Sequence, residues 1–373
     1  MKKKIGILGS SGFCGNIVFE ELKQSGYRLR CGHRYIKKDL VDKYIEHVSV
    51  DVLNDKELYL FCKDCDLIVN ATGPSYVTSP KIAYAIKKLD LKYVDLFGVN
   101  LLDDEIILNT KSVIGTGNFP GLSGIVLKWL NEKYSKNLKR IYMYAGGNEK
   151  VTLNALIDVL MSSLDGYIET NCFIYKGEKK KISREVDLKE QNNVDFLPLN
   201  SVCIKYISKE LLNVSEKFPN NEVYWNNVYL NPEHDKILRQ GVSEIQKEYS
   251  LEKVYQVADY INEQISSKRK AKDNLLQYKY QCSIILDYGF GEYEEFLEVI
   301  CGDTYLINGY LTAMCVKELL DRDDINKTMW AFEILDSKDV LEELLYRKAI
   351  LDIKLNGKSI RDEICVSQER GEI

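Results

Sequence analysis

The chain has 373 residues, of which 45% are hydrophobic, and 51 basic against 56 acidic side chains give a net charge of −5. This length favours two domains, and the mildly acidic balance argues against nucleic acid as the main partner. The first apolar run lasts only from Ile5 to Leu8, and no window approaches about 18 consecutive apolar residues, so we expect a cytoplasmic protein with no membrane span.

The first part of the chain alternates strands and helices. Strands are expected at 3–8, 27–34, 47–52, 66–74, 92–98 and from 112, and helices at 13–26, 54–65 and 80–89. Asn54 is the expected N-cap of the second helix. Repeated βα units predict an α/β fold with a doubly wound parallel sheet of the Rossmann type over residues 1–125.

The pattern changes after about residue 135. Strands are expected at 140–147 and 167–177, strands with polar and apolar alternation at 277–291 and 294–307, and helices at 153–164, 309–320 and 338–346. These elements predict a second α+β domain over 126–330 with a largely antiparallel sheet. The remaining segment, 331–373, is expected to pack back on the first domain.

Ten cysteines are spread along the chain and are expected to be reduced thiols. Cys62 and Cys65 have the spacing of half a zinc site. Because no second pair is spaced to complete a tetrahedral site, we expect no metal.

The segment "ILGSSGFCG", residues 7–15, leads from the first strand into the first helix. Gly9 is expected to permit a tight turn, Gly12 to let the backbone approach a pyrophosphate, and Gly15 to let helix and strand pack closely. A plain strand-to-helix turn is the alternative. The residues expected to contact the phosphates of a dinucleotide are Gly9, Ser11, Gly12, Phe13, Cys14 and Gly15.

The end of the second strand predicts which dinucleotide binds. An acidic residue there would accept hydrogen bonds from the ribose 2′-OH of NAD. This chain has Gly32, His33 and Arg34 instead, and a guanidinium favours a 2′-phosphate, so NADP(H) is preferred over NAD(H). Arg34 as an ordinary surface arginine is the alternative, and His33 either helps with the phosphate or stacks on adenine. Asp51 is a candidate partner of the adenine amino group.

Two later turns complete the predicted site. Small residues at the end of the fourth strand leave room for the nicotinamide ribose, which lies at the carboxyl ends of the strands in such folds. The residues concerned are Asn70, Ala71, Thr72, Gly73 and Pro74, together with Gly117 and Asn118 in the turn after the sixth strand.

These motifs together resemble the saccharopine dehydrogenase-like family of NAD(P)-dependent oxidoreductases. The similarity rests on "GSSGFCG", "CGHR", "DLIVNATGPSYVTSP", "KYVDLFG" and "VIGTGNFPGLSG", and it extends more weakly to residues 300–345. The chain departs from the family pattern at Val99 and Asn100, where glutamate is common, and in "SYVTSP", which lacks the usual glycine. The resemblance implies a pyridine-nucleotide domain and a substrate domain, a small-molecule substrate and a homodimer.

The chemistry that the resemblance implies is reduction of an imine formed from an amine and an oxo compound. An iminium already attracts the hydride, so orientation and exclusion of water matter most. Tyr76 is the candidate proton relay and Asp95 the candidate stabiliser of the iminium; their alternatives are packing at the sheet edge and capping of a turn. Reduction of a C=C or C=O bond in a lipid or secondary metabolite, and a non-catalytic NADP(H)-binding sensor or scaffold, are the competing functions.

Overall fold

The computed structural model describes residues 2–34, 43–102, 109–147, 151–182, 196–198, 200–268 and 277–365. The chain forms two compact units. The first combines Met1–Val126 with Thr304–Val340, and the second combines Leu127–Asp303 with Leu341–Ile373. No helix in the described part of the chain is long and apolar enough to cross a bilayer.

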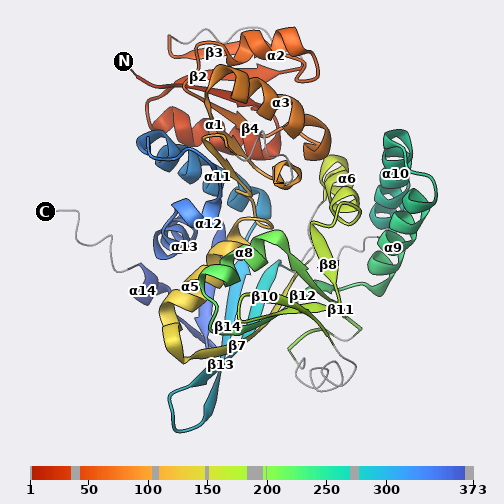
Figure 1. Cartoon of the computed structure of the whole chain (residues 1–373), viewed down its shortest axis with the longest axis vertical. Coiled ribbons are helices and arrows are strands. Elements are labelled where there is room, and N and C mark those ends of the chain that lie inside the picture. Colours follow the sequence, from red (N-terminus) through yellow and green to blue (C-terminus); the bar gives the residue numbers. More distant parts are fainter. Residues whose placement is uncertain are drawn as a thin grey trace, which may run out of the picture. The chain divides into compact units, whose positions relative to one another are not determined.

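Seven parallel strands form the sheet of the first unit, in the order β15-β6-β5-β4-β1-β2-β3. Strands β2, β3 and β4 of this sheet are labelled in Figure 1. The strands are β1 (Lys4–Leu8), β2 (Arg28–His33), β3 (Ile45–Ser49), β4 (Leu67–Asn70), β5 (Lys92–Asp95), β6 (Ser112–Ile114) and β15 (Thr328–Trp330). The order reverses next to β1, which is the doubly wound arrangement of a Rossmann fold. The expected α/β fold class is therefore confirmed.

Helices cover both faces of this sheet. They are α1 (Phe13–Gln24), α2 (Asp55–Cys62), α3 (Ser75–Leu89), α11 (Thr304–Asp321) and α12 (Ala331–Ile334), with the short η1 (Val99–Leu101). Phe61 of α2 and Ile82 of α3 share a buried cluster with Leu8 of β1. Ile5 and Ile7, also fully buried, alternate to the opposite face, where α1 and α11 contact the strands and each other.

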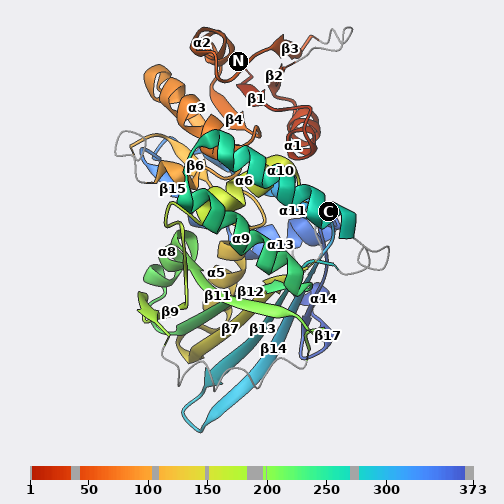
Figure 2. The ribbon, with the colours of Figure 1, turned by 90° about the vertical axis from the view of Figure 1, so that its right-hand side faces the viewer.

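A ten-stranded mixed sheet forms the second unit, and it is largely antiparallel as expected (Figure 2). Its main path is β10-β9-β12-β7-β13-β14-β16-β17, and among the strand pairs described for this sheet only β7 and β12 are parallel. The strands are β7 (Leu138–Gly146), β8 (Ile168–Thr170), β9 (Cys172–Tyr175), β10 (Glu178–Lys181), β11 (Val202–Ser208), β12 (Glu222–Tyr229), β13 (Lys279–Asp287), β14 (Glu292–Cys301), β16 (Ile350–Leu355) and β17 (Lys358–Ser359).

Three helices of the second unit have a hydrophobic cluster of their own. In it Leu160 packs with Ile245 and Ile261, which come from α6, α9 and α10. The helices assigned to this unit or crossing its limits are α5 (Leu122–Tyr134), η2 (Ser135–Asn137), α6 (Leu153–Ser162), α8 (Lys209–Lys217), α9 (Pro232–Lys247), α10 (Leu251–Lys268), α13 (Ser337–Tyr346) and α14 (Arg361–Ile364).

The structural units differ from the expected domain limits in the last third of the chain. Residues 304–340 belong to the first unit, because α11 packs on α1 and β15 pairs with β6. The end of the chain does not form a segment of the first unit, because β16 pairs with β14 in the second sheet. Both contacts join segments far apart in sequence, which local periodicity does not reveal.

Two helices begin earlier than their sequence pattern predicts. The helix expected from Pro80 is α3 and begins at Ser75, with Pro74 at its N-cap at φ −69° and Pro80 exposed within the helix. The helix expected from Gly309 is α11 and begins at Thr304, since β14 already ends at Cys301. Because the two helices begin at these residues, Tyr76 and the first turn of α11 lie at the carboxyl edge of the sheet.

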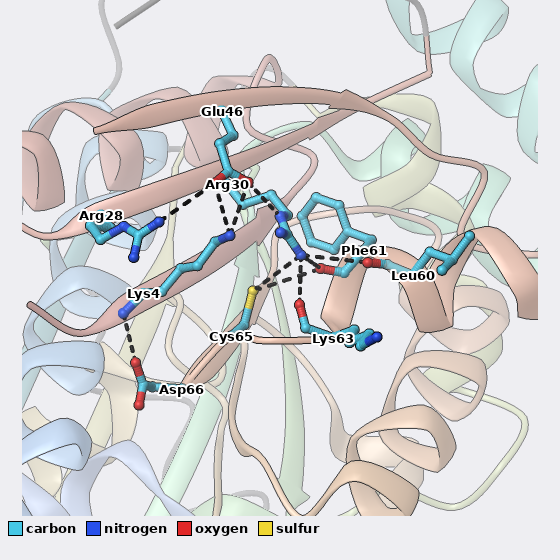
Figure 3. A network of polar contacts seen from close by, with 9 residues as sticks. All are labelled: Lys4, Arg28, Arg30, Glu46, Leu60, Phe61, Lys63, Cys65 and Asp66. Carbon is cyan, nitrogen blue, oxygen red and sulfur yellow. Dashed lines mark hydrogen bonds and ion pairs between the residues drawn. The ribbon is translucent and has the colours of Figure 1, made fainter. Parts of the chain in front are cut away.

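The connection from α2 to β4 is fixed by Arg30 of β2 (Figure 3). Its Nη1 donates to the carbonyl oxygens of Phe61 at 2.6 Å and Lys63 at 2.7 Å, and its Nε donates to Glu46 Oε2 at 2.9 Å. Glu46 also accepts from Lys4 Nζ at 2.9 Å. A guanidinium bonded to the last carbonyls of a helix stabilises that helix end, and this network ties α2 to β1, β2 and β3.

Candidate functional site

The glycine loop between β1 and α1 is built from three glycines with different surroundings. Gly9 has φ +81°, and a Cβ there would lie 2.6 Å from the carbonyl oxygen of Ala71. A Cβ on Gly15 would overlap the carbonyl oxygen of Gly9. Gly12 has φ −74°, and the nearest atom to a Cβ on it is Gly9 O at 3.3 Å. Gly9 and Gly15 are thus required by the fold itself, whereas Gly12 leaves open space for a ligand.

The start of α1 is suited to an anion. Gly12 is its N-cap, no side chain makes a cap hydrogen bond, and the first turn contains no acidic residue. Ser11, Gly12 and Phe13 are exposed. Because the first N–H groups of a helix and its dipole both favour negative charge, the loop can hold a phosphate. The residues present therefore fit the pyrophosphate of a dinucleotide.

Helix α11 supplies contacts that the sequence pattern did not predict. Asn308 Oδ1 accepts from the backbone N–H of Asn118 at 2.6 Å, and its Nδ2 lies 3.6 Å from Cys14 Sγ. The ring of Tyr305 lies 5.3 Å from the ring of Phe13, which is 65% exposed. Asn308 thus joins the start of α1 to the turn after β6. Asn308 lies in "INGY", directly after the segment 294–307 that the sequence pattern predicts as a strand, so local pattern does not place it at this loop.

A buried polar network links the ends of β4 and β5. Asn70 Nδ2 donates to Asp95 Oδ2 at 3.0 Å, and Asn70 Oδ1 accepts from Thr72 N at 2.9 Å. Asp95 also accepts from the hydroxyl of Tyr93 and, at 2.9 Å, from the N–H of Phe97. The side chain of Asp95 is entirely buried, and that of Asn70 is almost entirely buried. Burial raises the pKa of Asp95, and the hydrogen bonds from Tyr93 and Asn70 act in the opposite direction.

This network changes the role expected for two residues. The carboxylate of Asp95 is completely buried and accepts the turn-capping bond from Phe97 N, which corresponds to the alternative of a turn cap. The side chain of Asn70 is likewise directed into the network. We therefore assign both a positioning role: they hold the turns after β4 and β5 in place.

The turn after β4 leads directly into α3. Ala71, Thr72 and Gly73 are half-buried, Pro74 is buried, and Ala71 N donates to Leu8 O at 2.9 Å, which places the turn beside the glycine loop. Tyr76, in the first turn of α3, is half-buried and its ring lies 5.8 Å from that of Phe97. Gly117 is buried in the turn after β6. The structure thus brings the predicted residues of β1, β4 and β6 to one edge of the sheet.

The end of β2 lies on the other side of the glycine loop. His33 Nδ1 is 3.4 Å from Ser10 Oγ, and Arg34 is exposed beyond it. Asp51, also exposed, follows β3 in a turn where its Oδ1 accepts from Leu53 N at 3.0 Å. His33 and Arg34 therefore lie at the end of β2 beside the glycine loop, and Asp51 takes part in the turn before α2.

The cysteine pair has a structural environment. Cys62 and Cys65 are buried, and Cys65 Sγ lies 3.7 Å from the carbonyl oxygen of Phe61. Burial raises the pKa of Cys62 to about 12 and that of Cys65 to about 11, so both are neutral thiols in this environment. Within the described residues, no group of three or more His, Cys, Asp or Glu side chains could hold a metal ion.

No protein-family model matches the sequence, and no curated protein matches it significantly. Solved structures align with about a quarter of the chain. A putative epimerase from Bacteroides thetaiotaomicron is 24% identical with a TM-score of 0.24, over 26% of this chain and 47% of its own. An oxidoreductase from Lactococcus lactis is 24% identical with a TM-score of 0.24, over 27% and 51%. A uronate dehydrogenase from Agrobacterium tumefaciens, solved with NAD, is 18% identical with a TM-score of 0.23, over 26% and 40%.

The chain spans about half or less of the length of these proteins. The fold class rests on the chain's own strand order, in which six parallel strands follow the Rossmann sequence and β15 extends it. The first unit is therefore a Rossmann domain whose glycine loop has the geometry of a phosphate-binding turn.

Proposed function

We propose that this protein is an NADP(H)-dependent oxidoreductase that reduces a C=N bond in a small-molecule substrate. The observation that carries the proposal is the glycine loop. A Cβ on Gly9 or Gly15 would overlap neighbouring backbone atoms, whereas a Cβ on Gly12 would approach only Gly9 O. No side chain caps the start of α1 at Gly12. That combination has a clear use in binding a pyrophosphate and no packing use of its own.

The preference for NADP(H) is argued from the end of β2. His33 and Arg34 stand where an NAD site carries a carboxylate, and Arg34 is exposed. A carboxylate would repel the 2′-phosphate, whereas a guanidinium forms charge-assisted hydrogen bonds with it. Bound NADPH would supply the hydride, and the residues of the chain would bind and orient it.

The reaction type is argued from the groups at the turns after β4, β5 and β6. Asp95 is buried and fully hydrogen-bonded, which leaves Tyr76 as the candidate donor of a proton among the predicted catalytic residues. An iminium needs only a hydride to become an amine, so a site that offers positioning and little acid–base chemistry suits this substrate. The motif resemblance to the saccharopine dehydrogenase-like family favours the same class.

A substitution at Gly12 tests the binding step. Alanine is allowed at φ −74°, but its Cβ would lie 3.3 Å from Gly9 O and alanine is a poorer N-cap than glycine, so Gly12→Ala should lower the unfolding free energy by about 1 kcal/mol at most, less than Gly15→Ala. The same methyl group occupies the approach of the pyrophosphate. We expect NADPH affinity, measured from the change in nicotinamide fluorescence, to fall by roughly tenfold or more, as for loss of about 1.4 kcal/mol.

The reaction is tested with the wild-type chain and a panel of amines mixed with oxo acids, aldehydes and ketones. Oxidation of NADPH, followed by its absorbance, should require both members of a pair. Oxidation with an unsaturated or carbonyl compound alone would replace the imine by a C=C or C=O substrate. NADPH that binds but is never oxidised across the panel would indicate a sensor or scaffold, and unchanged affinity in Gly12→Ala would contradict the assigned loop.

A further inference from the structure

Two histidines form a hydrogen-bonded pair beside the glycine loop. His33 Nε2, on the last residue of β2, lies 2.8 Å from His47 Nδ1 on β3. The ring planes are within 18° and the centroids are 5.1 Å apart, which corresponds to rings joined edge to edge. On the other side, His33 Nδ1 lies 3.4 Å from Ser10 Oγ, which donates to Gly32 O at 3.2 Å.

These contacts are consistent with one assignment of hydrogen-bond donors and acceptors along Ser10, His33 and His47. With the hydroxyl proton of Ser10 assigned to Gly32 O, Ser10 Oγ accepts from His33 Nδ1–H. His33 Nε2 is then an acceptor, and His47 Nδ1–H donates to it. The remaining nitrogen, His47 Nε2, has no hydrogen-bond partner among the described residues. A proton added at His47 Nε2 keeps every existing bond, whereas a second added proton would set two N–H groups against each other.

Among the residues that the structure describes, no carboxylate is hydrogen-bonded to or paired with either histidine. Cys31 shares this face of β2, and burial raises its pKa to about 12, so it remains a neutral thiol. Ser49 shares the face of β3 and donates to Arg34 O at 3.2 Å. Arg30 and Glu46 alternate to the opposite face and bond to each other.

Helix α1 covers this face, and its charged side chains contact other side chains or are exposed to solvent. On α1, Glu21 pairs with Lys317 of α11 at 3.8 Å, Lys23 Nζ lies over the ring of Phe19, and Glu20 is exposed. Burial lowers the pKa of His33, and the neighbouring His47 lowers it further. Both effects favour the neutral form of His33.

We propose that His47 is a determinant of cofactor preference: it takes up a proton from solvent at Nε2 when the 2′-phosphate of NADP(H) binds beside His33 and Arg34. This inference rests on the proposed NADP(H) function. The ligand it recognises is a ribose 2′-phosphate, a dianion that would favour the charged form of the pair through electrostatic attraction. NAD(H), with a neutral hydroxyl at that position, would provide no such attraction.

The test is isothermal titration of the full chain with NADPH and with NADH, each in two buffers of different ionisation enthalpy. At about pH 7.5 a phosphate monoester, whose second pKa is about 6, is already a dianion and cannot account for proton uptake. We expect NADPH binding to take up a substantial fraction of a proton and NADH binding to take up none. His47→Asn keeps a donor near the position of Nδ1 but cannot be protonated, so it should abolish the uptake and weaken NADPH several-fold. His234→Asn, the same change at the third histidine of the chain, is the control and should behave as wild type.

The outcomes separate this inference from the function on which it rests. Suppose that NADPH binds more tightly than NADH, but the binding enthalpy does not depend on the buffer, or proton uptake is the same in His47→Asn. Either result overturns the role of His47 and leaves the cofactor assignment intact. Equal affinities for NADPH and NADH, unaffected by Arg34→Ala, overturn the NADP(H) preference and the inference together. Proton uptake that is lost in His47→Asn but retained in Arg34→Ala supports it.

Discussion

Two helices of the Rossmann unit, α1 and α2, begin in opposite ways. Asn54 caps α2 by accepting from Lys56 N at 3.1 Å and Glu57 N at 3.3 Å, and Glu57 Oε2 accepts from Asp51 N at 2.8 Å. The start of α1 has Gly12 as N-cap, with no side-chain cap and no acidic residue in its first turn. The expected cap at Asn54 is confirmed.

This difference separates a structural helix start from one that can receive a ligand. The chain satisfies the first N–H groups of α2 with its own oxygen atoms, and Arg30 bonds to the carbonyls at the other end of that helix. A side-chain cap contributes about 1 kcal/mol relative to alanine, whereas glycine at the N-cap, as in α1, loses only a few tenths of a kcal/mol. An approaching phosphate would supply the missing negative charge, so the comparison predicts that changes at α1 affect binding and changes at α2 affect stability.

The largest effect is expected where the glycine loop is closed by packing. Gly15→Ala would place a Cβ onto the carbonyl oxygen of Gly9, so α1 would have to move away from the loop. We expect a loss of about 3 kcal/mol in unfolding free energy, the upper end of the range for overpacking, measured by urea denaturation. If Gly15→Ala proves as stable as Gly12→Ala, the close approach of α1 to Gly9 is not needed for folding.

The next effect is expected at the far end of α2. Arg30 is largely buried, with 13% of its side chain exposed, and Arg30→Ala removes hydrogen bonds to Phe61 O, Lys63 O and Glu46. We expect a loss of about 2 kcal/mol, since hydrogen bonds to charged groups contribute about 1.5–3 kcal/mol. Arg30→Lys keeps the charge beside Glu46 but lacks the guanidinium fork, so it should recover only part of the loss. Equal stability of Arg30→Ala and wild type would rule out this network as a stabiliser.

The smallest effect is expected at the N-cap of α2. Asn54→Ala removes the acceptor of two backbone N–H groups and should lower the unfolding free energy by about 1 kcal/mol. NADPH affinity should stay at the wild-type value, because Asn54 caps a helix that contributes no predicted phosphate contact. A large loss of NADPH binding in Asn54→Ala, with stability unchanged, would contradict the contrast between α1 and α2.

Much of the first unit could be predicted because its signals are local. The glycine spacing at 9, 12 and 15 and the repeated βα pattern identify the sheet and the loop. The start of α11 could not be predicted in this way, because "TYLI" fits a strand as well as a helix. Its place in the first unit depends on contacts between residues almost 300 positions apart, such as Asn308 with Cys14.

The role of Asp95 shows a second limit of local pattern. In a Rossmann fold, a carboxylate at the end of a parallel strand can act on the substrate or can cap the following turn. Only the burial of Asp95, with its bonds to Asn70, Tyr93 and Phe97, distinguishes the two. Tyr76 remains a predicted proton relay, because its half-buried ring is compatible with packing and with catalysis.

The sequence by itself determined the fold class, the glycine loop and the cap of α2, because hydrophobic period, turn residues and capping residues act over a few neighbouring positions. Tertiary structure alone decided which polar groups are enclosed and which are paired. Asp95 is enclosed, Asn308 reaches the loop from α11, and His33 meets His47 because β2 and β3 lie in parallel register. Burial and pairing depend on distant chain segments, and they determine which groups can carry or exchange a proton.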